Sequence, residues 1–371
     1  MRKTLDELLD YIQPQPYIVH SENYNHLFKT PVLTAGQTFV LGKTNETDGI
    51  YTASKINPII LFDDFTTACK WVDFPFKVKS SACKIIIPKT GTNIRYCYYA
   101  MKSIKFDASQ HKRYWISQYS KLGIPSYGPQ KENLIADSLD CISSLIEKKK
   151  AEISSLDSLV KSRFMEMFGD VLRNSKNFQT CHFGEYVYQM NIGPFGSDLK
   201  NDCFVPKELS ACMVYEQKHA IEKTLNVPTR YISNEKYSHL KRFEIGPGDI
   251  IVSCRGTVGE CWILPEEAPK GIIHPSLMLI KPNDAVNHEF LMYLLERILS
   301  EQTQQGSGVK MAIRAKDLSK IVCIKPSRED QNHFIDFVHL VDKSRFVVQQ
   351  EIKDLQELLD SKMEEYFGGE E

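Results

Sequence analysis

The stretch EISSLDSLVKSRFMEMFG at residues 152–169 returns 199 positions later as EIKDLQELLDSKMEEYFG at residues 351–368. Eight of the 18 aligned positions carry the same residue, and both copies end in Phe-Gly. A long segment without this similarity precedes each copy. An internal repeat of this kind indicates two like halves, each built as a variable block followed by a repeated element.

Each repeated element is predicted to be one long helix. Residues 130–168 contain no Pro or Gly, and their apolar residues recur at the three- and four-residue steps of a helix. The same pattern runs from Phe334 to Met363. Pro129 before the first helix and Gly169 after it are start and stop signals. Such a helix is roughly 58 Å long at about 1.5 Å per residue, so its narrow apolar stripe needs a partner helix.

The expected partner is the other copy. The first helix must carry the chain to the second block, so the second helix can pack on it only by running back. The pair is therefore predicted to be antiparallel, with a pseudo-two-fold axis and one block at each end. A duplex DNA target with two half-sites has matching symmetry. The pattern leaves open the alternative that each helix lies on its own block.

These signals predict an α+β chain with four segments. Residues 1–125 and 175–325 form the two blocks, residues 126–174 the central spacer helix, and residues 326–371 the distal spacer helix. The chain has 371 residues, of which 42% are hydrophobic, and this is enough for two domain cores.

The net charge of −1 conceals an uneven distribution. Residues 1–125 carry 16 Lys+Arg against 10 Asp+Glu, whereas residues 326–371 carry 5 against 12. The basic first block favours phosphate binding, although solubilising surface lysines give the same count.

Several site classes are not indicated. The ten cysteines form no CxxC motif and no Cys/His cluster at ligand spacing, so neither zinc nor a disulfide framework is expected. The sequence shows no signal peptide and no apolar run of membrane-spanning length, so a cytoplasmic, non-membrane protein is expected. The adjacent Asp63 and Asp64 have no partnering His, and we expect them to serve in capping or a turn.

The first block offers a short set of candidate binding residues. A buried strand is predicted at 59–62, followed by a turn that carries Thr66. Residues 76–81 alternate apolar with polar, so a half-exposed strand would place Lys77, Lys79 and Ser81 on one face. That face could line a nucleic-acid groove, or its lysines could protect a strand edge.

The second block repeats this organisation with different residues. A glycine-rich turn at 193–197 precedes Lys200, and a strand is predicted at 250–253. The loop after that strand presents Arg255 between small residues, without the GxxxxGK[ST] pattern of a phosphate loop. A late segment rich in Gly and Ser contains Lys310.

The strings PVLTAGQTFVLG, FDDFTTACKWVDFPFKVKSSACKI, GPFGSDLK, RYISNEKYSHLKRFEIGPGDIIVSCRGTVG and IRAKDLSKIVCIK resemble the target recognition domains of type I restriction-modification specificity subunits. LVKSRFMEMFGD resembles their helical spacer, and the resemblance covers essentially the whole chain. One departure is the string HPSLM at 274–278, where family members often have an Asn-Gln-Ala-Leu-like string.

The resemblance implies a DNA-binding adaptor. Each block would read one half of a bipartite double-stranded DNA site, the helices would set the spacing, and two methyltransferase subunits would dock around them. S-adenosylmethionine would serve the methyltransferase subunits, and ATP with magnesium the restriction or motor subunits. No catalytic residue, metal or cofactor is expected on this chain.

Direct readout of DNA relies on Arg or Lys to guanine and on polar side chains to other base edges. Our candidates for DNA contact are Thr66, Lys77, Lys79, Ser81, Ser197, Lys200, Lys241, Arg255, Thr257 and Lys310. Two other functions remain open on the sequence. One is a helical scaffold whose end domains bind proteins, and the other is a standalone restriction and methylation enzyme, which the missing cofactor motif disfavours.

The missing catalytic signatures predict that the isolated chain is catalytically silent. Incubated with DNA, magnesium, ATP and S-adenosylmethionine, the purified chain should transfer no methyl group and cut no strand. Radiolabelled methyl incorporation and gel electrophoresis measure both. Either activity in the pure chain would contradict the assignment.

Overall fold

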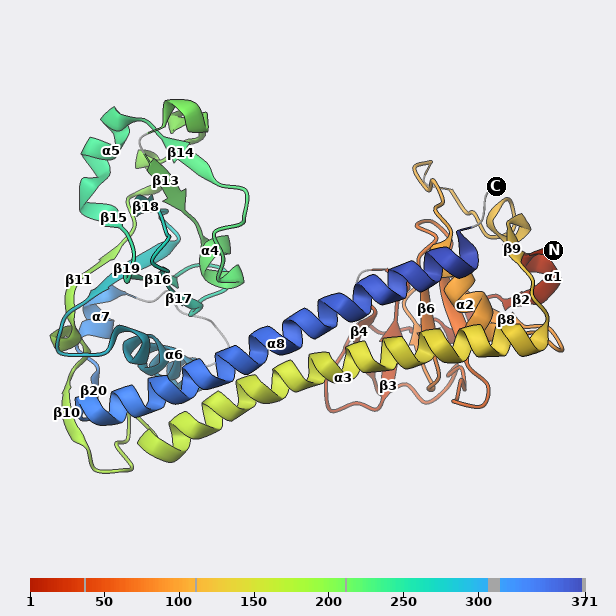
Figure 1. Cartoon of the computed structure of the whole chain (residues 1–371), viewed down its shortest axis with the longest axis horizontal. Coiled ribbons are helices and arrows are strands. Elements are labelled where there is room, and N and C mark those ends of the chain that lie inside the picture. The colour runs from red at the N-terminus through yellow and green to blue at the C-terminus, as the bar shows by residue number, and fades with distance from the viewer. Residues whose placement is uncertain (37, 111, 211, 306–313, 369–371) are drawn as a thin grey trace. The chain divides into compact units, whose positions relative to one another are not determined.

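In the computed structural model, the described residues are 1–36, 38–110, 112–210, 212–305 and 314–368 (Figure 1). The chain forms two compact units. The first comprises Met1–Ile153 and Val347–Glu371, and the second comprises Ser154–Phe346. Each unit contains parts of the two long helices described below. We call the rest of the first unit block one and the rest of the second unit block two. Within the described residues, no helix is both long and apolar enough to cross a membrane.

Two helices of 40 residues each confirm the predicted repeat, α3 at Pro129–Phe168 and α8 at Arg328–Phe367. In the first unit, the Tyr127 hydroxyl at the start of α3 donates to the Tyr366 carbonyl at the end of α8, at 2.9 Å. The two helices are therefore antiparallel there, and the contacts of the second unit agree.

In the second unit the end of α3 meets the start of α8. Arg345 pairs with Asp157 at 2.7 Å, and the Phe164 and Phe334 rings lie 5.3 Å apart. Residue numbers fall along α8 as they rise along α3, so this part of the pair is antiparallel as well. The predicted fold class, α+β with a pair of long antiparallel helices, is confirmed.

Block one has a central antiparallel sheet of order β2-β8-β5-β6 and a smaller sheet of order β4-β3-β7. The strand predicted at 59–62 is β5, whose residues Ile59 to Phe62 are buried because the sheet is covered on both faces. The elements of block one are β1 Arg2–Thr4, α1 Leu5–Leu8, β2 Leu9–Ile12, β3 Thr30–Leu33, β4 Val40–Thr44, β5 Ile59–Asp63, β6 Cys69–Val72, β7 Lys77–Val78, β8 Cys83–Pro88, α2 Ile94–Ser103 and β9 Gly123–Pro125.

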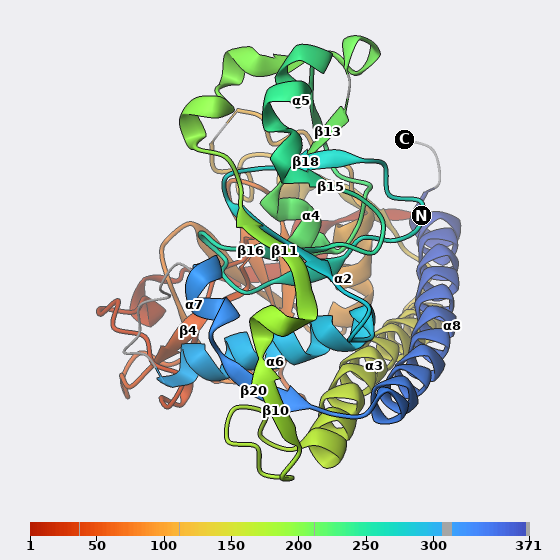
Figure 2. The ribbon, with the colours of Figure 1, turned by 90° about the vertical axis from the view of Figure 1, so that its left-hand side faces the viewer.

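Block two has a central antiparallel sheet of order β11-β19-β16-β17, of which β11 and β16 are labelled in Figure 2, and a sheet of order β12-β14-β13-β18-β15. The strand predicted at 250–253 is β16. The elements are β10 Gln179–His182, β11 Val187–Ile192, β12 Phe204–Val205, β13 Cys212–Tyr215, α4 Gln217–Glu222, β14 Arg230–Ile232, α5 Asn234–Leu240, β15 Glu244–Ile245, β16 Ile250–Ser253, β17 Cys261–Ile263, β18 Gly271–Ile273, β19 Leu277–Pro282, α6 His288–Gln305, α7 Ala315–Ser319 and β20 Val322–Lys325.

The central sheets of the two blocks share one topology despite their different sequences. Strands β2, β8, β5 and β6 of block one have the same order and directions as β11, β19, β16 and β17 of block two. A two-stranded antiparallel ladder closes each block, β1 with β9 and β10 with β20. The repeat first seen in the helices therefore extends to the blocks.

The same polar contact attaches a short helix to a long one in both units. Asn93 caps α2 by accepting two backbone N–H groups, and its amide donates to Asn133 of α3 at 2.6 Å. Asn287 accepts the backbone N–H groups of Glu289 and Phe290 in the first turn of α6, and its amide donates to Asn332 of α8 at 3.1 Å. Asn133 and Asn332 are again 199 positions apart.

A phenylalanine at the end of each long helix is buried in the core of a block. Phe367 of α8 packs on Tyr96 of α2, with ring centroids 5.3 Å apart. Phe168 of α3 packs on Phe290 of α6, with centroids 5.0 Å apart. Burial of an aromatic ring is a large apolar contribution to stability, so this pair of contacts fixes the long helices to the blocks.

We expect Phe168→Ala to lower the free energy of unfolding of the second unit by about 3–5 kcal/mol, because a fully buried ring leaves a cavity. Leu159→Ala on the same helix is the matched control. That side chain is 47% exposed, so its removal should cost about 1 kcal/mol or less. Urea unfolding measures both variants, and an equal loss in the two would show that the Phe168 contact does not anchor the helix.

Candidate nucleic-acid interface

The turn between β5 and β6 presents the predicted Thr66. The Asp63 carboxylate accepts the backbone N–H groups of Phe65 at 2.8 Å and of Thr66 at 3.0 Å. An aspartate that binds the backbone two and three residues on stabilises a turn, which confirms the turn role expected for Asp63. Thr66 is exposed on this turn.

The loop that precedes β8 lies beside this turn. The backbone N–H of Asp64 donates to the carbonyl of Ala82 at 2.7 Å. Ser81, in the same loop, is half-buried. We call residues 64–68 together with residues 80–82 corner one.

Block two has the equivalent surface at the equivalent strand ends. The backbone N–H of Cys254, directly after β16, donates to the carbonyl of Ser276 at 2.8 Å. The turn between β16 and β17 carries Arg255 and Thr257, both exposed. We call residues 254–260 together with residues 274–276 corner two. In each block, therefore, predicted residues lie at the equivalent corner of the block's own central sheet.

Corner two is held in shape by Gln217 of α4. Its side-chain amide donates to the carbonyls of Arg255 at 2.6 Å and Thr257 at 3.1 Å. Gly256 and Gly259 adopt positive φ angles of 65° and 95°, which a side chain would disfavour. The Arg255 side chain is thus exposed on a turn whose backbone is fixed.

Two ionisable groups in or next to corner two, His274 and Glu216, have shifted pKa values. Burial lowers the pKa of His274, with Arg230 and Arg255 acting in the same direction, so the neutral imidazole is favoured. Burial would raise the pKa of Glu216, but hydrogen bonds from Arg230 and Lys218 outweigh it and the pKa is lowered. The Glu216 carboxylate is therefore charged and already paired, while the Arg255 cation remains at the surface.

The predicted contact residues differ in exposure. Lys79 is half-buried and forms an ion pair with Glu22. The hydrogen bond that its ammonium group donates to the Glu22 carboxylate raises the pKa of Lys79. Lys310 lies outside the described residues. The side chains that are exposed are Thr66, Ser197, Lys200, Lys241, Arg255 and Thr257. Their contacts with DNA stay a prediction.

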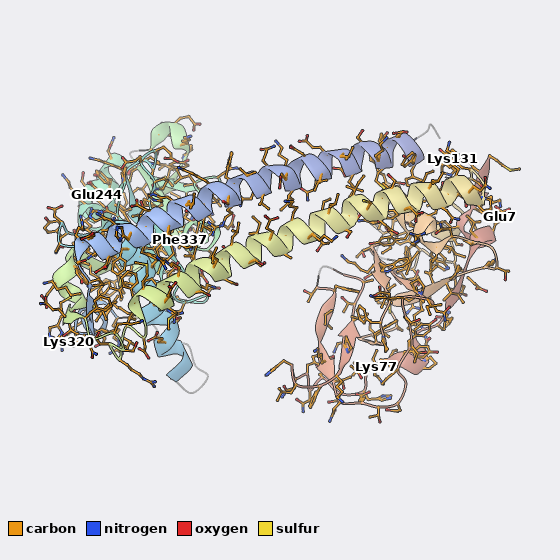
Figure 3. The ribbon with its side chains drawn as sticks, turned by 60° about the horizontal axis from the view of Figure 1, so that its bottom comes forward. Glu7, Lys77, Lys131, Glu244, Lys320 and Phe337 are labelled. Carbon is orange, nitrogen blue, oxygen red and sulfur yellow. The ribbon has the colours of Figure 1, made fainter. Side chains whose placement is uncertain are left out.

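The expectation for Lys77 is wrong. The predicted half-exposed strand at 76–81 is reduced to β7, and Lys77 is fully buried rather than on an open face. Its ammonium group donates to the Asp48 carbonyl and pairs with Glu46, both at 2.8 Å. Figure 3 shows Lys77 among the side chains of block one. The loop at 46–49 supplies the compensating carboxylate, which alternation along one strand cannot reveal.

Ser197, Lys200 and Lys241 lie in or next to short 3-10 helices that pack on a second hydrophobic core of block two. Leu199 is buried in the same hydrophobic cluster as Leu240 and Phe243. These segments therefore belong to the part of block two built on β12 to β15 and β18.

Gln217 is a positioning residue that sequence inspection missed. It lies 38 residues before Arg255, and only the folded packing of α4 against β16 and β17 brings the two together. The sequence between them contains no spacing signal that would reveal the contact.

Comparison with known proteins identifies the region that contains corner two. Residues 214–357 match the family model of the type I restriction modification DNA specificity domain. Over these residues the chain resembles a type I restriction-modification specificity domain. The family resemblance inferred from the sequence is confirmed.

A curated relative is the type I restriction enzyme EcoR124I/EcoR124II specificity subunit of Escherichia coli, which is 51% identical over 125 residues. This match spans 33% of the chain and 31% of the length of the relative.

Two solved structures share the fold. The type I restriction-modification S subunit from M. genitalium is 16% identical, with a TM-score of 0.52, and the match covers 99% of this chain and 96% of that one. A chain from a type I restriction-modification system studied for complex assembly and conformational transition is 14% identical, with a TM-score of 0.54 and coverage of 99% and 97%. At this identity the similarity establishes the fold alone.

We expect Gln217→Ala to loosen the turn of corner two without unfolding the specificity domain. Amide hydrogen exchange at residues 255–259 should become faster, while the free energy of unfolding falls by about 1 kcal/mol, the typical value of one hydrogen bond. Gln189→Ala is the matched control, because its amide donates to the Arg242 carbonyl at 2.8 Å. Unchanged exchange in the Gln217 variant would refute the positioning role.

Proposed function

We propose that the chain is the DNA-specificity subunit of a type I restriction-modification complex. Each block reads one part of a bipartite target in double-stranded DNA, and the two long helices join the readers. The observation that carries the proposal is the repeat of one exposed corner on two equivalent sheets, in a chain that resembles a specificity domain over residues 214–357.

The chemistry of the corners suits DNA. An arginine can donate two hydrogen bonds to the O6 and N7 acceptors of guanine, and threonine hydroxyls can donate to or accept from base edges. Arg255 and Thr257 are exposed in corner two, and Thr66 is exposed in corner one. The +6 balance of residues 1–125 adds attraction for phosphates that is independent of sequence.

The proposal assigns the chemical steps to partner chains. Two methyltransferase subunits would bind S-adenosylmethionine, and restriction or motor subunits would use ATP and magnesium, giving the assembled complex DNA adenine methylation and cleavage. This chain would supply recognition only, in the cytoplasm where such a complex meets DNA. The described residues contain no group of three or more potential metal-ligating side chains, so no protein ligand set for a metal is assigned to them.

Exchanging one block tests the proposal. We replace residues 1–125 with the corresponding block of another specificity subunit, assemble the chain with methyltransferase subunits, and map methylated sites by methylation-sensitive sequencing. One half of the methylated sequence should change and the other should persist, because each half is read by a separate block.

The reciprocal exchange of residues 175–325 is the control and should change the other half. If either exchange altered both halves, the blocks would not be independent readers. If the unaltered chain directed no methylation with any methyltransferase partner and shifted no duplex on a gel, the assignment to DNA recognition would be wrong.

A further inference from the structure

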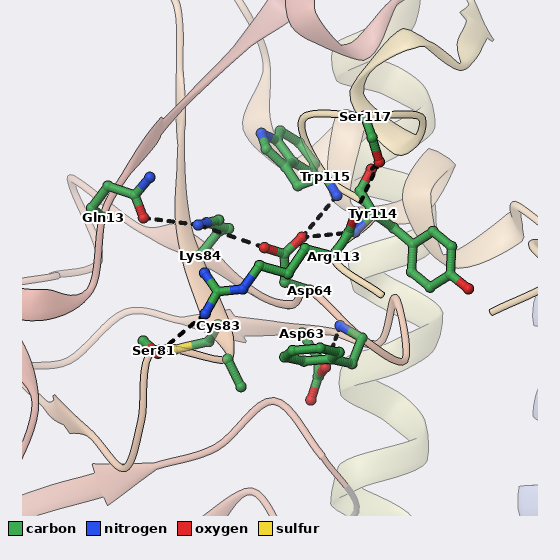
Figure 4. A network of polar contacts seen from close by, with 12 residues as sticks. Gln13, Asp63, Asp64, Ser81, Cys83, Lys84, Arg113, Tyr114, Trp115 and Ser117 are labelled. Carbon is green, nitrogen blue, oxygen red and sulfur yellow. Dashed lines mark hydrogen bonds and ion pairs between the residues drawn. The ribbon is translucent and has the colours of Figure 1, made fainter. Parts of the chain in front are cut away.

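Corner one is next to an arginine from a distant part of the chain. Arg113 lies 32 residues after Ser81, and its guanidinium donates to the Ser81 hydroxyl at 3.2 Å. The same guanidinium lies over the Phe65 ring, 5.8 Å from its centroid. Arg113 itself is exposed, and Figure 4 shows its contact with Ser81. Both contacted residues belong to corner one, so Arg113 extends that surface.

A buried carboxylate fixes the backbone that follows Arg113. One oxygen of Asp64 accepts the backbone N–H groups of Tyr114 at 3.1 Å and Trp115 at 2.8 Å. The other oxygen pairs with Lys84 at 3.5 Å, and both of these side chains are 2% exposed. The Lys84 ammonium also donates to the side-chain carbonyl of Gln13 at 2.8 Å.

This network positions Arg113 before any ligand arrives. A buried ion pair recovers little more than the cost of removing its charges from water, so it is weak evidence for added stability. Here the carboxylate joins the loop at 113–115 to the end of β5, next to the turn that carries Thr66. A side chain whose backbone is already fixed loses less conformational entropy on binding, which strengthens binding and favours one geometry.

Corner two also has an exposed arginine, but it lies within the turn itself rather than in a separate loop. Arg255 comes from the turn between β16 and β17 and is fixed through Gln217. In corner one the equivalent turn, between β5 and β6, has no arginine in its sequence at 64–68. Arg113 reaches that turn from a separate loop. Each block therefore presents an exposed arginine next to equivalent strand ends, those of β5 and β8 in block one and those of β16 and β19 in block two.

We propose that Arg113 is a specificity-determining residue of block one, whose guanidinium donates to the acceptor edge of a guanine in the half-site read by that block. One of its five N–H donors goes to Ser81, which orients the group. The planar fork then matches the paired O6 and N7 acceptors of guanine. The inference rests on the proposed function and names a residue that carries it out.

The test separates base reading from phosphate attraction. We assemble the full chain with methyltransferase subunits and measure affinity for the mapped target duplex and for duplexes with single base-pair changes in either half-site, at two salt concentrations. Arg113→Lys keeps the charge and loses the fork, whereas Arg113→Gln loses both. Arg255→Ala serves as the variant for the other half-site.

Both Arg113 variants should bind the target roughly 5- to 150-fold more weakly, the range of one bidentate base contact. Discrimination at one guanine-containing base pair of the block-one half-site should disappear, with discrimination in the other half-site unchanged. Arg173→Ala is the control, because this arginine side chain is 80% exposed in a loop of the second unit and pairs with Asp170, three residues before it. It should bind like the unaltered chain.

Three results would overturn the inference. Unchanged affinity and discrimination in Arg113→Gln would remove Arg113 from the interface. Full discrimination in Arg113→Lys, with a weaker salt dependence in Arg113→Gln, would reduce Arg113 to a phosphate contact. An unaltered complex that prefers no duplex would overturn the proposed function and this inference with it, whereas the first two results leave the proposed function intact.

Discussion

The structure depends on burying the apolar stripes of two helices that are too long to be covered by a single block. Helices α3 and α8 each have 40 residues, and in each unit part of one packs antiparallel on part of the other. The buried rings of Phe168 and Phe367 then enter the cores of block two and block one. Because each block takes the end of one helix and the start of the other, neither half of the repeat completes its core alone.

The blocks use this common frame to present different side chains from the same place. Two antiparallel sheets of like topology end in corner one and corner two. What holds the exposed residues differs, with buried Asp64 and Lys84 in one block and Gln217 in the other. A fixed sheet with variable loops can change the recognised chemistry while the core and the helix contacts remain constant.

Sequence reasoning succeeded where periodicity or local chemistry decides the structure. The long helices, the strands β5 and β16 and the turn at Asp63 follow from helical spacing, apolar runs and side-chain to backbone bonding. It failed for Lys77, which is buried and forms an ion pair with Glu46 of a neighbouring loop. It also missed Gln217 and Arg113, whose partners lie 38 and 32 residues away along the chain. Those contacts arise from tertiary packing, for which one sequence contains no periodic signal.

The most direct test of the account is a map of the residues that touch DNA. We would cross-link a photoreactive target duplex to the complex assembled with methyltransferase subunits and identify the linked peptides of this chain by mass spectrometry. We expect cross-links within residues 64–68, 80–82 and 112–113 from one half-site, and within residues 254–260 and 274–276 from the other. Cross-links confined to α3 and α8, or to both blocks from a single half-site, would contradict it.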